Sequence, residues 1–202
     1  MGSDKLRQND INCSTKQNKS MRPQAVLSRR LAVEGMFQLM KEKRFDDISI
    51  SEICDRGGIS RQTFYRNFDT KEDVISYYVH HLVGRHLQQI TADMDTDIRS
   101  FFENLPFPEY FLRFLYENQK MYLLRESILP LMEEFMSSSM STSIPAGPEF
   151  DLYVGRFLAD TMVSVLETWV IRDFKDSKTD LYMIMKGLIA GIGKQNPPSG
   201  SV

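Results

Sequence analysis

The segment GISRQTFYRNF, at positions 58–68, concentrates long side chains that can each donate several hydrogen bonds. On a helix that begins after Ser60, Phe64 and Phe68 are four residues apart and therefore share one face. Another face would present a polar ridge formed by Arg61, Gln62, Tyr65 and Arg66. Arg and Gln can form paired hydrogen bonds with planar groups that carry acceptors, so the chemistry of this ridge would be molecular recognition.

Two helix starts and a tight turn would position the ridge. Ser49 precedes Glu52 by three residues, which is the spacing of a capping box and predicts a helix start. The helix that follows, over 50–56, must be short because the glycine pair 57–58 ends it. Ser60 is then the predicted N-cap of the ridge helix.

Further helices are predicted on both sides of this pair. Apolar residues spaced three or four apart predict a helix over 26–40, and Thr70 with Asp73 is expected to cap a helix that reaches about residue 91. The segment 97–140 predicts more helix, interrupted by prolines at 106, 108 and near 130, and the last two helices are predicted over 149–174 and 179–192. No strand-like alternation is long enough to matter, so the predicted fold class is all-α.

The short helix, the glycine turn and the ridge helix together form the pattern of a helix-turn-helix. A helix about 10 to 12 Å across fits the major groove of B-DNA, where Arg and Gln reach base edges. Hydroxyl groups such as those of Thr63 and Tyr65, and amides at a helix start, suit phosphate oxygens. The alternative is an ordinary solvated helix surface, but the capped preceding helix and Lys71 at the next helix start favour the DNA interpretation.

The segment FDDISISEICDRGGISRQTFYRNFDTKEDVI resembles the DNA-binding signature of the tetracycline-repressor (TetR) family of bacterial regulators, and the similarity extends over about residues 26–80. Its specific part is the run 63–65, followed by Phe68 and the pair 71–72. Cys54 and Gly57 occupy positions where the family commonly has alanine, and we interpret them as tolerated small residues. A glycine in so short a helix weakens it by about 1 kcal/mol.

By matched position, the resemblance implies two kinds of DNA contact. Contacts with the DNA backbone are implied for Ser49, Ser60, Thr63, Tyr65 and Lys71. Contacts with base edges are implied for Arg61, Gln62 and Arg66. Most members of the family repress transcription and some activate it, so the resemblance leaves the sign of regulation open.

A single helix-turn-helix binds DNA weakly, and a dimer can place two of them in major grooves about 34 Å apart, so we expect a homodimer on a double-stranded DNA operator. The predicted interface lies on the last two helices and consists of Leu152, Gly155, Ala159, Met162, Leu166, Leu181, Ile184 and Leu188. The resemblance supports this location, because in the TetR family the last two long helices commonly form a four-helix interface. The alternative is that these residues are buried in the chain's own core.

The middle helices are rich in Phe, Tyr, Met and Leu, which suits either a core or an apolar pocket for a small molecule. The resemblance makes a pocket for an unidentified small-molecule effector the expectation. Candidate lining residues are Tyr110, Arg113, Tyr116, Tyr122 and Trp169.

Several other kinds of site are not predicted. His80, His81 and His86 include no pair with the i, i+4 spacing of two ligands on one helix face, so we predict neither a metal nor a cofactor. Cys13 and Cys54 lie in unlike contexts, which argues against a disulfide and makes Cys54 a core residue. We find no Ser/His/Asp set, no paired catalytic carboxylates and no Gly-rich phosphate loop, so the protein is not expected to be an enzyme.

Charge and hydropathy complete the prediction. The net charge is −2, but residues 1–68 hold 13 Lys+Arg against 8 Asp+Glu, whereas the remainder holds 12 against 19. The chain has no apolar segment resembling a signal peptide, and its longest apolar stretches are interrupted by charges, so we expect a soluble cytoplasmic protein without a membrane partner. The expected regions are a disordered arm at 1–22, a three-helix helix-turn-helix domain at 23–72, a ligand-binding and dimerisation domain at 73–194, and a flexible tail at 195–202.

The predicted function is a homodimeric, sequence-specific transcriptional regulator, a repressor that a small-molecule inducer releases. The alternatives are an activator, a DNA-binding adaptor without ligand response, or a helical protein that processes a small molecule in a Met-rich cavity.

Overall fold

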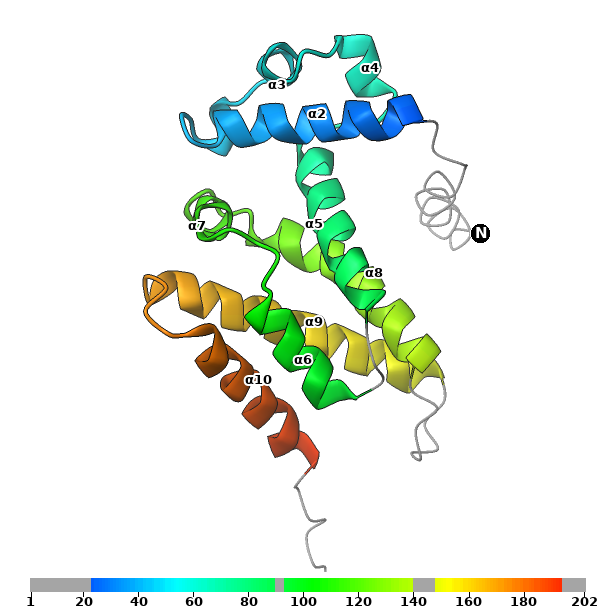
Figure 1. The fold of residues 1–202 in the computed structure, drawn as a ribbon, viewed down its shortest axis with the longest axis vertical. Helices are drawn as coiled ribbons and strands as arrows, with labels where there is room; N and C mark the ends of the chain where they lie inside the picture. The colour runs from blue at the N-terminus through cyan, green and yellow to red at the C-terminus, as the bar shows by residue number, and fades with distance from the viewer. Residues whose placement is uncertain (1–22, 90–92, 140–147, 194–202) are drawn as a thin grey trace, which may run out of the picture. The chain divides into compact units, whose positions relative to one another are not determined.

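The computed structural model describes residues 23–89, 93–139 and 148–193, and every regular element in these ranges is a helix (Figure 1). The predicted arm at 1–22, the tail at 195–202 and most of the predicted loop before Pro148 lie outside the described residues. The all-α fold class is confirmed. The chain divides into two compact units, the first formed by residues up to Lys43 with 47–74, and the second by 44–46 with the residues from Ile75 onward.

The first unit contains α2 (Pro23–Leu39), α3 (Ile50–Gly57), α4 (Arg61–Tyr65) and the first turn of α5 (Lys71–Leu87). The helices expected from the caps and the apolar spacing are therefore present. α2 begins three residues earlier than predicted, and its first apolar residues, Val26 and Leu27, are exposed.

The core of the first unit is formed where α2 crosses α3. Gly35 and Gly57 lie at this crossing, and a Cβ atom added to Gly57 would lie 2.5 Å from the carbonyl oxygen of Leu31. A Cβ atom on Gly35 would lie 2.5 Å from the carbonyl oxygen of Ile53. Gly57 is therefore required by the backbone approach of α2, and the interpretation of it as a merely tolerated small residue is corrected.

The second unit contains the rest of α5, the turn around Phe45, and the five helices that follow. These are α6 (Met94–Glu103), α7 (Glu109–Glu117), α8 (Met121–Ser139), α9 (Pro148–Ile171) and α10 (Lys178–Gly193). The long helices α8 and α9 pack together, α7 lies against α9, and α6 packs along α10 (Figure 1). Their buried side chains include Phe102, Phe111, Leu115, Leu124 and Leu166.

The interruption expected near Pro130 is wrong, because α8 continues through that residue. Proline removes one backbone hydrogen bond and disfavours a helix interior by about 3 kcal/mol. The side chains of Ile128 and Leu131, on either side of Pro130, are both buried, and Pro130 itself is exposed. Packing against α9 therefore keeps the helix continuous where the local sequence favours a break.

The predicted dimer interface on the last two helices also needs correction. Five of its eight members lie in the core of the second unit and present almost no surface to another molecule, namely Gly155, Ala159, Met162, Leu166 and Leu181. Gly155 is buried because α9 approaches α8 closely at this residue, where an added Cβ atom would lie 3.2 Å from the backbone of Glu133 on α8. Leu152, Ile184 and Leu188 are the members that remain exposed, at 47%, 48% and 47% of their surface.

We expect Gly57→Ala to lower the free energy of unfolding by about 1 to 3 kcal/mol, since the new methyl group would push α2 and α3 apart. Gly84→Ala is the matched control, because its Cβ atom would meet only the Leu131 side chain at 4.0 Å. That substitution should leave stability unchanged or raise it by up to about 1 kcal/mol through helix propensity. Chemical denaturation followed by circular dichroism measures both, and equal stability of the two variants would contradict the need for glycine at the crossing.

Candidate nucleic-acid interface

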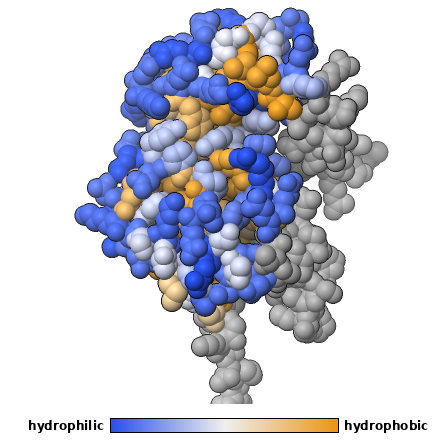
Figure 2. Space-filling view, viewed as in Figure 1, coloured by the Kyte–Doolittle hydropathy of each residue, from blue (hydrophilic) through white to orange (hydrophobic). Residues whose placement is uncertain are grey.

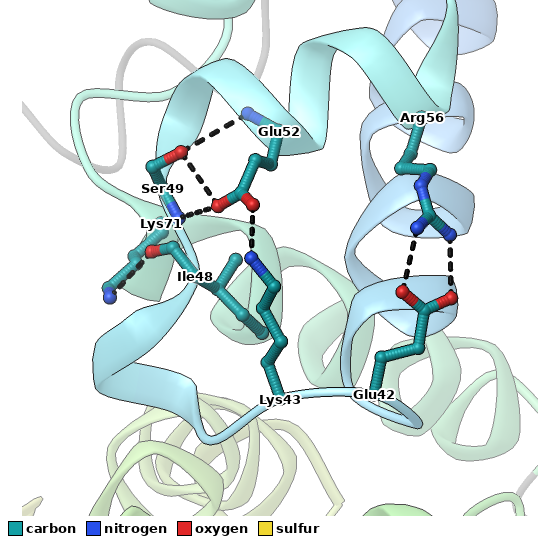
Figure 3. Close-up of polar contacts among 7 residues, drawn as sticks. All are labelled: Glu42, Lys43, Ile48, Ser49, Glu52, Arg56 and Lys71. Carbon is teal, nitrogen blue, oxygen red and sulfur yellow. Dashed lines mark hydrogen bonds and ion pairs between the residues drawn. The ribbon is translucent and has the colours of Figure 1, made fainter.

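The start of α3 is held by the capping box that the sequence predicts (Figure 3). The Ser49 hydroxyl accepts the backbone N–H of Glu52 at 3.3 Å, and the Glu52 carboxylate accepts the backbone N–H of Ser49 at 3.0 Å. Lys43 forms an ion pair with the same carboxylate. The hydrogen bond from Lys43, followed by that from the Ser49 backbone, lowers the pKa of Glu52 from 4.5 to about 2. Glu52 is therefore ionised throughout the neutral and mildly acidic range.

A glycine turn connects α3 to α4. Gly58 has φ of 63°, in the left-handed region, where a side chain would be strained. The next helix starts at Ser60, whose hydroxyl accepts the backbone N–H of Thr63 at 3.1 Å. Both helix starts predicted from the sequence are therefore present, and the turn between them is fixed by backbone geometry.

The ridge is exposed, as its spacing predicts. Phe64 is fully buried and Phe68 is 5% exposed, and their rings are 5.5 Å apart, so these two side chains fasten α4 to the first unit. The other side of the helix presents Arg61, Gln62, Tyr65 and Arg66 to solvent. The helix itself has only five residues, and Phe68 follows it in a turn whose backbone N–H still bonds the carbonyl oxygen of Phe64.

Arg61 is held by a residue that the sequence analysis does not single out. Its Nε donates to the hydroxyl oxygen of Ser51 on α3 at 3.0 Å, and one of its terminal nitrogens donates to the same oxygen. This edge-on contact leaves the remaining guanidinium donors directed away from Ser51. Ser51 has no sequence signal of its own, because the contact depends on how α3 and α4 pack.

Lys71 has a structural partner that was not predicted. Its ammonium group donates to the carbonyl oxygen of Ile48 at 2.8 Å, just before the capping box (Figure 3). The side chain is half-buried, and the bond ties the start of α5 to the start of α3. An ammonium carries three donors, so this bond is compatible with a phosphate contact but gives Lys71 a role in stability as well.

Two further polar contacts engage arginines of α2 and α3. Arg56 donates two hydrogen bonds of 2.7 Å to the Glu42 carboxylate, which lowers the pKa of Glu42 (Figure 3). Arg29 on α2 donates to the side chain of Asn67 at 3.2 Å, directly after the ridge. The side chains of the ridge residues Gln62, Tyr65 and Arg66 form no such bonds within the described residues and keep their donors for solvent or a ligand.

The candidate effector residues of the second unit are only partly brought together. Tyr116 and Tyr122 line a surface hollow of about 490 Å³ at the turn between α7 and α8. Tyr110 and Arg113 are not among its lining residues, and Arg113 is bound to Asp173 at 2.6 Å. Trp169 is 3% exposed and its indole N–H donates to the carbonyl oxygen of Asp176 at 2.9 Å, so it stabilises the end of α9 and does not line the hollow.

Among the described residues, no group of three or more His, Cys, Asp or Glu side chains could hold a metal ion. Cys54 is 2% exposed, and its burial raises the pKa of its thiol. The helices of the described ranges include none that is both long and apolar enough to cross a membrane.

Comparison with known proteins agrees with this geometry. Residues 33–78, which contain α3, α4, the C-terminal part of α2 and the first turns of α5, match the family model of bacterial regulatory proteins, tetR family. Over this helix-turn-helix segment and its flanking helices, the chain resembles regulators of the TetR family. It is 28% identical over 85 residues to the HTH-type transcriptional regulator AlkX of Mycobacterium tuberculosis, and the match spans 40% of each chain.

Two solved structures show the same fold over a larger part of this chain. The dihydroxyacetone kinase operon activator DhaS has a TM-score of 0.50 and 18% identity, with 82% of this chain and 96% of that chain covered. The fatty acid degradation regulator FadR from Bacillus halodurans has a TM-score of 0.52 and 18% identity, with 89% and 100% covered.

We expect Glu52→Gln to lower stability at neutral pH and to have a smaller effect as the pH falls towards 2. A carboxyl whose pKa is lowered by folding contributes stability above its unfolded pKa of 4.5 and loses it as the pH falls through about 2. Thermal unfolding of both proteins across pH 2 to 7, a range set by these two values, gives the difference between them. Glu126→Gln is the control, because Glu126 has no ion-pair partner in the described part of the chain. A difference that stays constant with pH would contradict the ion-paired capping box.

Proposed function

We propose that this protein is a homodimeric, sequence-specific DNA-binding transcriptional regulator, acting as a repressor that a small-molecule effector releases. The observation that carries the proposal is the exposed ridge on α4, fastened by the buried Phe64 and Phe68 and presented after a rigid turn at Gly58. The match of residues 33–78 to the family model of bacterial regulatory proteins supports it independently.

The contacts of the first unit support separate roles for its polar residues on DNA. Arg61 is held against α3 by Ser51 and therefore offers its free donors from a restricted set of positions, which suits base recognition. Gln62 and Arg66 stand beside it on the ridge and share this role. We assign phosphate contacts to Ser49, Ser60, Thr63, Tyr65 and Lys71, whose hydroxyl or ammonium groups can serve phosphate oxygens.

A second copy of the chain would cover the apolar surface left exposed on the last two helices. On α9 and α10 the exposed large apolar residues are Leu152, Tyr153, Phe157, Ile171, Met183, Ile184 and Leu188. Among them lies Gly187, where an added Cβ atom would meet no atom within 4 Å, so another helix could approach the α10 backbone closely. In the face shown in Figure 2, hydrophilic surface predominates and hydrophobic residues form separate patches.

An effector would act by binding two conformations of the protein unequally, with typical couplings of about 1 to 3 kcal/mol. α5 is the element that supports such coupling, because its first turn belongs to the first unit and its remaining turns belong to the second. The solved relative DhaS is described as an activator, so a reporter gene behind the bound promoter must decide the sign. If deletion of the regulator lowers expression of the reporter gene, the protein is an activator and the proposed repression is refuted.

We expect Arg61→Ala and Gln62→Ala each to weaken binding to the cognate operator by about 1 to 3 kcal/mol, with little effect on random DNA. Fluorescence anisotropy measures both affinities at several salt concentrations, with one duplex taken from the DNA upstream of the gene that encodes the protein and a second duplex of scrambled sequence. Lys71→Ala should weaken binding to both duplexes and flatten the salt dependence. Because Lys71 also bonds the Ile48 carbonyl, that variant should in addition unfold at a lower temperature.

Arg172→Ala is the control for these variants, because Arg172 pairs with Asp176 on the surface of the second unit. It should bind both duplexes like the unaltered protein. Equal losses on cognate and scrambled DNA for Arg61→Ala and Gln62→Ala would refute the base contacts, and indifference of the unaltered protein to any duplex would refute the proposed function.

We expect Leu188→Glu to dissociate the dimer, because a carboxylate in the middle of a buried apolar interface is costly to desolvate. Light scattering after size-exclusion chromatography should show a mass falling from twice 23.4 kDa to 23.4 kDa. Val26→Glu is the matched control, since Val26 is similarly exposed at 42% but lies on α2. A mass unchanged by Leu188→Glu, or lowered equally by Val26→Glu, would exclude this face as the interface.

A further inference from the structure

The hollow at the turn between α7 and α8 has an unusual chemical lining. Its lining residues carry two carboxylates, two phenol rings, one amide and one thioether, and they are Tyr116, Glu117, Gln119, Met121, Tyr122 and Glu167. Met121 is buried, whereas both tyrosines are exposed, at 37% and 43% of their surface. The lining contains no Lys, Arg or His, so the hollow is anionic and aromatic.

The two carboxylates of the hollow are not used by the fold. Within the described residues, neither Glu117 nor Glu167 forms a hydrogen bond or an ion pair. The basic residues of the neighbouring segments are engaged elsewhere: Arg113 pairs with Asp173, and Arg125 pairs with Asp160. Two negative charges therefore converge on one hollow while the nearby positive charges are directed to other acids.

We propose that this hollow binds a small organic cation, an amine or quaternary ammonium group that carries an apolar body. Carboxylates attract a cation, and the faces of tyrosine rings add a favourable cation–π interaction. The buried Met121 supplies a polarizable contact for an apolar group. The volume of about 490 Å³ lies within the range of pockets that hold drug-sized molecules. Neutral molecules lose the charge attraction here, and anions are repelled.

The same turn also anchors the segment that precedes α3. The backbone N–H of Phe45 donates to the side chain of Asn118 at 2.8 Å, and the fully buried Phe45 ring packs edge-on against Phe114. Lys120 lies over the Phe45 ring at 4.9 Å and pairs with Asp46 at 3.4 Å. Asn118 and Lys120, which hold the segment around Phe45, lie between lining residues of the hollow along the chain. A ligand that shifts this turn would therefore also shift the segment around Phe45.

The binding inference stands apart from DNA binding, but its regulatory meaning rests on the proposed function. The test is isothermal titration of the full chain with benzyltrimethylammonium, and with benzyl alcohol and phenylacetate as neutral and anionic comparisons. The cation should bind at least about tenfold more tightly than either comparison. Equal affinity for the cation and benzyl alcohol would overturn the proposal.

Variants locate the site. Glu117→Gln combined with Glu167→Gln should weaken cation binding about tenfold or more. It should leave the melting temperature unchanged, because neither carboxylate has a partner in the described chain. Glu126→Gln, an exposed carboxylate of α8 outside the lining, is the matched control and should bind the cation normally. Full binding by the double variant would show that the cation binds elsewhere and would overturn the proposal.

DNA titration with and without the cation then separates the two hypotheses. Cation binding that changes operator affinity, with the change abolished in the double variant, supports both the site and its regulatory role. Cation binding by a protein that is indifferent to every duplex supports the site and refutes the proposed function. Operator binding by a protein that does not bind the cation supports the proposed function and refutes the site.

Discussion

The burial of Phe64 is the constraint on which the candidate DNA contacts depend. A helix of five residues is too short to be stable by its own hydrogen bonds, since nucleation consumes most of what its few bonds contribute. Its orientation is therefore set by tertiary packing, with Phe64 fully buried and Phe68 continuing the same side. The helix contacts both α2 and α3, whose close crossing requires glycine at 35 and 57. A change in the core of the first unit would thus alter the position of the ridge without replacing any residue that is proposed to contact DNA.

Several polar residues of the first unit stabilise the fold and are also proposed to contact the DNA backbone. Ser49 and Ser60 accept backbone amides at two helix starts. The Ser49 hydroxyl also donates to the Glu52 carboxylate at 2.9 Å, and the Ser60 hydroxyl shares a hydrogen bond of 2.9 Å with the Thr63 hydroxyl, so a phosphate contact at Ser49 would take its hydrogen from Glu52. Lys71 uses one of its three donors on the Ile48 carbonyl. The side chains proposed to hold phosphates are therefore positioned by the folded protein before DNA binds, which lowers the entropic cost of ordering them on association. The ridge residues Gln62 and Arg66 are less restrained, so they can adapt to different base edges.

The elements predicted well are those with local signals. The serine caps, the left-handed glycine and the spacing of Phe64 and Phe68 are properties of neighbouring residues, and they place α3 and α4 within a residue or two. The failures all involve contacts between segments distant in sequence. Packing on α9 overrides the helix-breaking tendency of Pro130, and the approach of α2 requires the glycine at 57. Likewise, helical periodicity identifies an apolar stripe on α9 without indicating whether the chain's own helices or a partner covers it. Ser51 could not be found from sequence for the same reason, and of the five candidate pocket residues only Tyr116 and Tyr122 line the hollow.

The chain passes between the two units three times, and this bears on how an effector signal could travel. Besides the crossing inside α5, the short excursion at 44–46 enters the second unit and returns, with Phe45 as its buried anchor. Directly after that excursion come Ile48, which accepts from Lys71, and Ser49, which caps α3. A shift of Phe45 would therefore first displace the capping box and the start of α5, where phosphate contacts of Ser49 and Lys71 are proposed. The hydrogen bond from Lys71 to Ile48 joins the segment that follows residues 44–46 to the start of α5. An effector could therefore change the start of α3 and the start of α5 together, whereas a connection through α5 alone would change only the start of α5.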